Sequence, residues 1–487
     1  MFQTLKNAWK TPELKTKLLF TLIIVILYRL GASIMVPWID PAATTQYAES
    51  ISGTVLEYLS ILSGGALTQA TLFALSVSPY ITASIVMQLL TIAIPKLEEL
   101  SKEGEEGKKK ISAITRLVTI ALALVTSFGY TLMIMSQGMT TLVKLGTKGY
   151  TWVNGETTTA FNLVEVFKNG AGLQFVAILA TYCAGAALVM WLAEKINERG
   201  IGNGISIILF ANILSGIPTT IANLWALASI PFTAGLHDGF HASMIVGPVL
   251  ALLIVAIVVA ATYFVIWFTN SERRIPVQYA KRVVGRKMYG GQSSSLPLKL
   301  NMSGVMPIIF ANAIVTIPAT IAMFTTNAKA EWIKKANELI AGFNQTNALY
   351  IILFGILLIA FAFFYIMISF NPVEVANNIR NNGGAVPGIR PGKPTKDYIQ
   401  KILNRITFIG ALFLAVIAVL PMIVYAILAI EPIYLAVGKF LNVNLVSVLG
   451  GIAFSGSSLL IVTGVALETI RELEAQLTMR NYKGFLD

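Results

Sequence analysis

One stretch, from Leu59 to Pro95, is apolar enough for a membrane, yet it is interrupted where a simple membrane helix would be continuous. Gly64 and Gly65 weaken a helix through their backbone freedom, and Pro79 removes an amide donor and disfavours helix in the residue before it. Non-helical backbone at membrane depth survives only where protein or water covers its polar groups. The stretch is therefore expected to line a cavity and not to face lipid.

Apolar runs of membrane-spanning length recur along the whole chain. Of its 487 residues, 55% are hydrophobic and only 12% are charged, far from the roughly 25% charge of a soluble domain. A bilayer core needs about 20 apolar residues per helix, so the pattern predicts an all-α integral membrane protein and excludes β-barrel alternation. The first run lacks a small-residue cleavage site and is interpreted as a retained span. We predict ten spans, at about 17–37, 75–95, 113–136, 172–193, 204–225, 243–269, 304–325, 348–370, 406–430 and 445–467.

The positive charges separate into alternate loops when these spans are assumed. Of the 36 Lys and Arg residues, 28 lie on the side of the N-terminus and seven on the other. The positive-inside rule then predicts that both termini are cytoplasmic. Arg29 lies inside the first span and is expected to snorkel to the outer interface. Ion-coupled transporters usually keep ionisable residues at the midplane, and these spans hold few.

Ten spans divide into two sets of five. An odd number of spans per half forces related halves into opposite orientation, the inverted repeat of many transporters. This prediction rests on the count alone, because the residues show no convincing self-similarity. The predicted parts are an N-terminal half, 1–225, an outer connecting loop, 226–242, a C-terminal half, 243–470, and a tail, 471–487.

Two inner loops, 270–302 and 371–405, are long and basic. The first has seven basic residues against one acid, and the second has six against two. Loops of this length are usually functional, and a basic surplus suits an acidic partner such as ribosomal RNA or an acidic protein face. Charge that only sets topology, together with attraction to anionic lipid, is the alternative.

The residues contain no catalytic constellation. His237 and His241 have the spacing of metal ligands on a helix, but Gly235 and Gly239 favour a loop. Cys183 has no cysteine partner for a disulfide. We therefore expect no metal, no cofactor and no enzymatic activity. The GIGNG motif at 200–204 predicts a tight turn that opens a helix at Ile205.

Six blocks resemble the SecY family of bacterial translocon channel subunits, in order along nearly the whole chain. They are SPYITASIVMQLLTIAIPKLEELSKEGEEGKKKI, EKINERGIGNGISIILFANI, SERRIPVQYAKR, LPLKLNMSGVMPIIFA, GIRPGKPT and SSLLIVTGVALETIRELEAQLTMRNYKGFL. The resemblance implies an hourglass channel between two inverted five-helix halves in the bacterial cytoplasmic membrane. Through it unfolded polypeptide would cross, or leave sideways into lipid. The implied partners are SecE, SecG, the SecA motor ATPase, the ribosome, signal sequences and nascent polypeptide, membrane insertase components and the lipid bilayer, with no DNA.

The resemblance also implies roles for particular residues. An apolar constriction dewets and resists ion leakage. The implied pore ring is Val77, Ile81, Ile205, Leu209, Ile309 and Ile461. The implied plug, near 61–70, includes Ile61, Leu62, Gly64, Gly65 and Leu67. The lateral gate between the second and seventh spans would use Thr82, Gln88 and Asn301, whose mild polarity lets helices separate without exposing charge. Docking of the motor or ribosome would use Arg273, Arg274, Lys281, Arg282, Arg286, Arg390 and Lys393, with Arg390 ranked first.

The chain departs from the family pattern at Ser78, at Ser455–Ser458 and in the long outer loop 137–170. The first two lie beside the implied ring and gate, so they put the pore diameter and gating threshold in doubt. Two other functions stay open. An ion-coupled small-solute secondary transporter is one, and a docking platform without a conduit would survive if the ring residues faced lipid.

Overall fold

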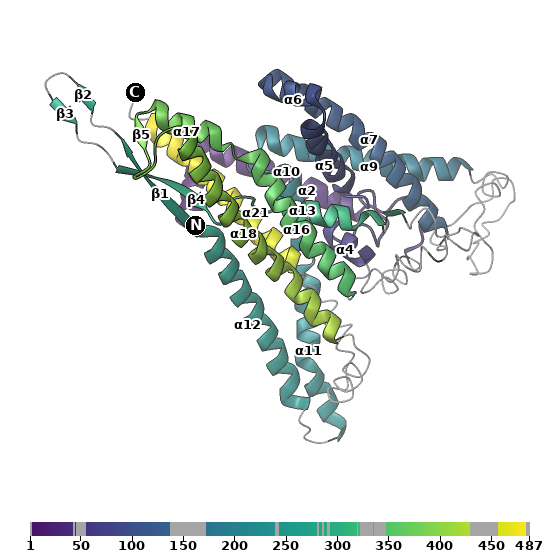
Figure 1. Cartoon of the computed structure of the whole chain (residues 1–487). Coiled ribbons are helices and arrows are strands. Elements are labelled where there is room, and N and C mark those ends of the chain that lie inside the picture. The colour runs from purple at the N-terminus through teal and green to yellow at the C-terminus, as the bar shows by residue number, and fades with distance from the viewer. Residues whose placement is uncertain are drawn as a thin grey trace.

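The computed structural model describes residues 2–41, 55–136, 172–238, 243–279, 282–284, 287–289, 293–318, 320–321, 347–428 and 456–483, with single positions 44 and 335. Its helices in the first half are α1 (Phe2–Lys10), α2 (Pro12–Ser33), α4 (Val55–Leu62), α5 (Ser78–Ala93), α6 (Pro95–Lys102), α7 (Glu105–Ser136), α9 (Gly172–Arg199), α10 (Gly204–Ser215) and α11 (Ile217–Asp238). Those in the second half are α12 (Ser243–Asn270), α13 (Met306–Val315), α16 (Ala348–Ser369), α17 (Pro372–Asn381), α18 (Lys393–Leu428) and α21 (Gly456–Lys483). Figure 1 shows their arrangement.

Most of the predicted spans correspond to helices of the right length. Within the described residues, seven helices are long and apolar enough to cross a membrane, or eight if α5 and α6 form one span. The chain bends by 101° between these two helices. The bend lies at Ile94, which is extended with φ −109° and ψ 112° because Pro95 disfavours helix in the residue before it. The seventh span is represented by the ten residues of α13, and the predicted start of the tenth, 445–455, lies outside the described residues.

The helices pack in an order that closes on itself. From α5 it runs through α7, α9 and α10 to α21, and then through α18, α16 and α13 back to α5. Two joints close this ring of helices between the halves, one between α10 and α21 and the other between α5 and α13, and α11 with α12 and α1 with α21 also join the halves. Such a closed order leaves an interior that all of these helices can line.

Four helix pairs of the first half recur five spans later. The contacts α5 with α7, α7 with α9, α9 with α10, and α2 with α10 correspond to α13 with α16, α16 with α18, α18 with α21, and α12 with α21. The two joints then each pair a helix with its own counterpart. Two repeated five-span halves predict this pattern.

The two basic loops, 270–302 and 371–405, together form a three-stranded sheet at an end of the molecule, and the first loop also holds a separate two-stranded sheet (Figure 1). In the first loop, β1 (Glu272–Tyr279) pairs antiparallel with β4 (Ser293–Lys299), and β2 (Arg282–Val284) pairs with β3 (Lys287–Tyr289). In the second loop, β5 (Gly384–Ala385) adds to the free edge of β1. The pairing of these two loops was not predicted from the sequence.

Alternation along β1 anchors this sheet to the helices. Ile275 and Val277 are buried while Pro276 between them is exposed, the period of two that a strand requires. Val277 packs with Ile379 of α17 and Ile399 of α18. The three-stranded sheet is therefore anchored to α17 and α18 of the second half through β1.

Two local predictions near the glycines have different outcomes. The GIGNG motif does form the turn that opens α10, where Asn203 accepts a hydrogen bond from the amide of Ile205 at 3.1 Å. The loop expected at Gly235 is wrong, because α11 continues as helix to Asp238. His237 lies in this helix, whereas His241 and Gly239 lie outside the described residues.

Candidate functional site

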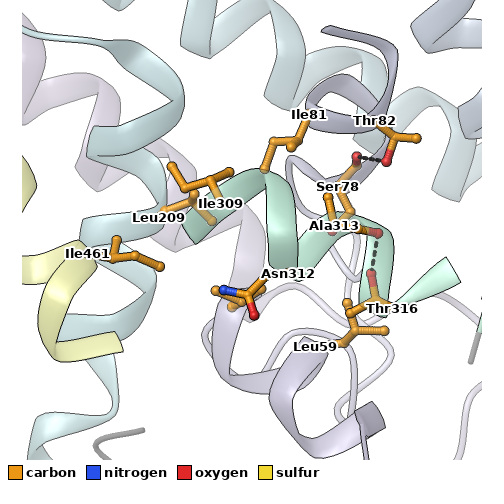
Figure 2. A pocket seen from close by; sticks show the side chains of 11 residues that line it. Leu59, Ser78, Ile81, Thr82, Leu209, Ile309, Asn312, Ala313, Thr316 and Ile461 are labelled. Atoms are coloured by element: carbon orange, nitrogen blue, oxygen red, sulfur yellow. Dashed lines mark hydrogen bonds between the residues drawn. The ribbon is translucent and has the colours of Figure 1, made fainter. Parts of the chain in front are cut away.

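A cavity lies where α5, α10, α13 and α21 meet. Its empty volume is about 410 Å³, partly open to solvent, and most of its lining is apolar. Four of the six predicted ring residues line it, one from each helix: Ile81, Leu209, Ile309 and Ile461 (Figure 2). At most 6% of each side chain is exposed. Four helices separated in sequence thus bring branched aliphatic groups to one point.

The other two predicted ring residues pack nearby but do not line the cavity. Val77 is buried directly before α5, and Ile205 is half-buried in the first turn of α10. Both contact the same hydrophobic cluster that contains the other four. All six therefore pack within the protein, so the condition under which a docking platform without a conduit would survive, ring residues that face lipid, is not met.

Helix starts position the ring residues. Ile81 and Ile309 each lie in the first turn of a helix that has a proline near its beginning, where the missing amide proton costs nothing. The sequence pattern Val-x-Pro-x-Ile-x-Ala occurs at 77–83 and again at 305–311. The two ring isoleucines occupy the same place in this pattern. The absence of self-similarity assumed from the sequence is therefore wrong, and this repeated pattern was the signal that could have revealed it.

Two polar residues that were not predicted from the sequence also line the cavity. They are Asn312 of α13 and Thr316, which directly follows α13 (Figure 2). Their spacing of three and seven residues from Ile309 is typical of one helix face and was available as a signal. Asn312 is 3% exposed, and its Nδ2 atom has no hydrogen-bond partner among the described residues.

The broken stretch that opens this region lies against the ring. Helix α4 ends at Leu62, and Gly64 and Gly65 follow with φ of +66° and +84°, which glycine adopts without strain. Leu59 and Leu62 line the cavity. The expected cavity beside this stretch is confirmed.

Side chains of α7 and α9 cover the polar backbone that follows. The hydroxyl of Tyr130 donates to the carbonyl oxygen of Leu67, and that of Tyr182 donates to Ala70 O at 3.2 Å. Leu67 belongs to a second cluster with residues of α7 and α9 and does not line the cavity. Of the predicted plug residues, only Leu62 borders the cavity, whereas Ile61, Gly64 and Gly65 are half-buried beside it.

The predicted gate residues bond within their own segments. Helices α5 and α13 pack against each other. Gln88 Nε2 donates to Ser84 Oγ at 3.5 Å, and Asn301 Oδ1 accepts from the amide of Gly304 at 3.1 Å. Thr82, which lines the cavity, donates to Ser78 O at 3.1 Å. Within the described part of the chain, no hydrogen bond joins Gln88 to Asn301.

Arg29 does not snorkel outward, so that prediction is wrong. Its Nη1 donates to Asn212 Oδ1 at 3.4 Å, and its side chain is partly buried. The guanidinium lies beside Gly64, whose unusual backbone leaves room for it. The guanidinium of Arg29 thus bonds to a polar side chain inside the protein, where a snorkelling arginine would contact lipid headgroups.

The predicted docking residues lie on the small sheet and the loop after it. Arg273, Arg274, Arg390 and Lys393 are exposed, and Arg274 pairs with Glu272 at 2.6 Å. Arg282 belongs to β2, and Lys281 and Arg286 lie outside the described residues. β5 pairs with Gln278 and Tyr279, at the end of β1 opposite to Arg273 and Arg274. Partial burial, and then the positive charge of Arg471, lower the pKa of Lys299 at the base of β4.

Comparison with known proteins gives a consistent result. The SecY family model matches residues 71–470. The protein translocase subunit SecY of Streptomyces coelicolor is 40% identical over 491 residues, and that of Mycobacterium tuberculosis is 37% identical over 496, each covering all of both chains.

Solved structures share the fold at low sequence identity. One described as a protein conducting channel has a TM-score of 0.54 and 15% identity over 95% of this chain and 92% of that one. A second concerns the SecY plug domain, which stabilises the closed state of that channel and maintains a membrane seal. Its TM-score is 0.56 with 16% identity, at the same coverage of 95% and 92%. Sec61 in the canine ribosome-channel complex has a TM-score of 0.56 with 14% identity, also covering 95% and 92%.

Proposed function

The chain belongs to the SecY family and is the protein-conducting channel subunit of a translocase, and from that premise we propose how its own residues open and close the conduit. The pore ring is Val77, Ile81, Ile205, Leu209, Ile309 and Ile461. The convergence of Ile81, Leu209, Ile309 and Ile461 on one cavity carries this proposal. Aliphatic side chains exclude water and ions when they close, and they contact a passing polypeptide without selecting its sequence.

The segment from α4 to about residue 70 acts as the plug. Leu59 and Leu62 contact the cavity from one side, so they cover the ring when the channel is at rest. The similar structure in which a plug domain maintains a membrane seal supports this role. Displacement of α4 would uncover the ring without requiring any of the long spans to move.

The lateral exit lies between α5 and α13. This is one of the two joints that close the ring of helices, and the other, between α10 and α21, is flanked by α2 on α10 and by α1 on α21, while α11 with α12 also joins the halves. The flanking helices strengthen that second joint, so separation is easier at the first. Thr82, Gln88 and Asn301 lie along this exit, and their uncharged polar groups can form or lose hydrogen bonds at low cost.

The basic strands of loops 270–302 and 371–405 dock the partners that drive transport. Sec61 and the yeast Ssh1 complex, both similar in fold, are described in complexes with ribosomes. The basic sheet of this chain suits ribosomal RNA or an acidic face of the SecA motor. We assign both termini and this sheet to the cytoplasmic side of the bacterial inner membrane. SecE and SecG complete the complex, and the motor or the ribosome supplies the energy, because the chain itself hydrolyses nothing.

A solute transporter is not favoured. It would need a substrate site and coupling groups near the midplane, whereas the described cavity is lined mainly by aliphatic side chains. Solute uptake into vesicles that follows an ion gradient and needs no motor would support that alternative.

Site-specific crosslinking tests the conduit directly. Cys183 is the single cysteine, so its replacement by alanine gives a clean background for Ile309→Cys. An arrested nascent chain with a central cysteine should form a disulfide with position 309. Leu252→Cys is the matched control, because Leu252 on α12 is 72% exposed on the outer surface. Equal crosslinking at 252 and 309, or none at 309, would contradict the proposed conduit.

A further inference from the structure

One buried amide connects the plug to the helices around it. Asn212 lies on α10 with 1% of its surface exposed. Its Nδ2 donates to the carbonyl oxygen of Leu62 at 2.7 Å and to the hydroxyl of Tyr28 at 2.9 Å. A longer contact of 3.3 Å reaches Ser76 Oγ. A single side chain therefore binds α2, the end of α4 and the segment before α5.

The other side of the same amide is also occupied. Asn212 Oδ1 accepts from Arg29 Nη1 at 3.4 Å. This arrangement fixes the orientation of the amide, because a reversed amide would bring two carbonyl oxygens together at Leu62 and two donors together at Arg29. The donor of Asn212 is thus committed to the plug backbone, and its acceptor is committed to Arg29.

Gly64 is shaped to fit this cluster. A Cβ atom at Gly64 would lie 2.4 Å from Arg29 Nη1, 2.9 Å from Ser215 Oγ and 3.0 Å from Asn212 Oδ1. Gly65 has a similar backbone conformation, but a Cβ there would meet nothing within 4 Å. The first glycine therefore serves close approach to the cluster, and the second serves the turn alone.

The amide also lies close to the ring. Leu209 precedes Asn212 by three residues on α10, which places both on neighbouring faces of one turn. Leu62, whose carbonyl Asn212 binds, contacts the cavity together with Leu209. A substitution of Asn212 should therefore disturb the packing of Leu62 and Leu209 around the cavity.

We propose that Asn212 is a positioning residue that latches the plug, holding the carbonyl of Leu62 until a substrate displaces it. This inference rests on the proposed function of the segment as the plug. The latch is reversible because, once substrate and water enter the conduit, the carbonyl oxygen of Leu62 can accept a hydrogen bond from water in place of Asn212. In the closed state this site is buried, with Asn212 1% exposed, so loss of the Asn212 donor leaves the Leu62 carbonyl without that partner and favours opening.

Two variants of the amide test the latch. Asn212→Asp keeps the shape of the side chain and an oxygen for Arg29 but removes the donor to Leu62. The ion conductance of purified complex in planar bilayers, without substrate, should rise on the order of tenfold, since an unpaired buried carbonyl is costly. Tyr28→Phe, which keeps the ring stacked on Phe73 with centroids 5.4 Å apart, should raise conductance less. This milder variant keeps the test usable if the first does not fold.

The two glycines supply a matched pair. Gly64→Ala and Gly65→Ala impose similar strain at positive φ, but only the first intrudes on the cluster. Conductance should rise more for Gly64→Ala than for Gly65→Ala, because Gly65 lies in the same proposed plug but a Cβ there does not intrude on the cluster. The combination of Gly64→Ala with Asn212→Asp should leak no more than the stronger single variant, because both release the same contact.

The outcomes separate the latch from the channel itself. Unchanged conductance in Asn212→Asp, while Ile81→Asn leaks, would overturn the latch and leave the conduit standing. An equal rise for both glycine variants would also overturn it. If Ile81→Asn conducts no better than the parent and no nascent chain reaches position 309, the proposed function itself fails.

Discussion

Gly204 on α10 and Gly456 on α21 occupy matching places in the two halves. A Cβ atom at either glycine would lie 2.0 Å from a backbone carbonyl oxygen of the neighbouring helix, that of Ala193 on α9 or that of Ile417 on α18. Each glycine precedes a ring residue by five positions, Leu209 in one half and Ile461 in the other. The same kind of close backbone contact therefore lies five residues before each of two residues that are proposed for the pore ring.

Alanine at either glycine should destabilise the fold. The added methyl meets a carbonyl and not a flexible side chain, so the helices must separate, at a cost of about 1–3 kcal/mol typical of overpacking. Thermal unfolding of the purified complex measures this loss. Gly355→Ala is the control, because its Cβ would meet only Val419 at 3.8 Å. A control as unstable as Gly456→Ala would contradict the argument.

Polar substitution in the ring should loosen closure. Ile81→Asn or Ile461→Asn introduces an amide that holds water where aliphatic groups exclude it, so reporters with defective signal sequences should be exported more efficiently. Export of a matched set of good and defective reporters measures the effect. Ile81→Leu keeps the apolar character and should leave export of the defective set at the parent level. Loss of selectivity in Ile81→Leu would show that shape, and not dewetting, governs closure.

Charge reversal at Arg390 should abolish motor-dependent transport while the folded protein stays in the membrane. Arg390 is exposed, so the change affects a partner and not the core. Translocation driven by the motor into membrane vesicles measures it, with protein level as a second readout. Lys108→Glu, an equal charge change at an exposed position on α7, is the control. Unchanged transport in Arg390→Glu would remove the docking role.

A charge at a buried position on β1 should detach the three-stranded sheet from α17 and α18. Val277 is 3% exposed, and an aspartate there would be buried without a partner at a cost of about 2 kcal/mol or more. Val277→Asp should weaken motor binding, while the resting ion conductance of the channel stays low. Gln278→Asp changes the exposed neighbour and should bind normally. Binding of the motor to the purified complex distinguishes the two.

The sequence predicted what depends on local composition. Apolar runs located most spans, and Gly64 with Pro79 located the broken stretch correctly, because backbone preferences act within a few residues. The bend at Ile94 could have been predicted from Pro95 in the same way.

What the sequence could not supply depends on contacts between distant segments. The pairing of β1 with β5 joins loops about a hundred residues apart, and no local pattern fixes that register. The environment of Arg29 was missed for the same reason, since its partner Asn212 lies on another helix. The ring residues came from a resemblance, because one aliphatic side chain in an apolar span looks like any other until the helices are assembled.

The order of helix packing has an energetic consequence. Widening the conduit at α5 and α13 breaks the interface between these two helices, whereas the pairs inside each half and the contacts of α10 with α21, α11 with α12 and α1 with α21 stay intact. The work of admitting a substrate is thus decoupled from the stability of the fold, so mutations could tune the ease of opening without endangering the protein that opens.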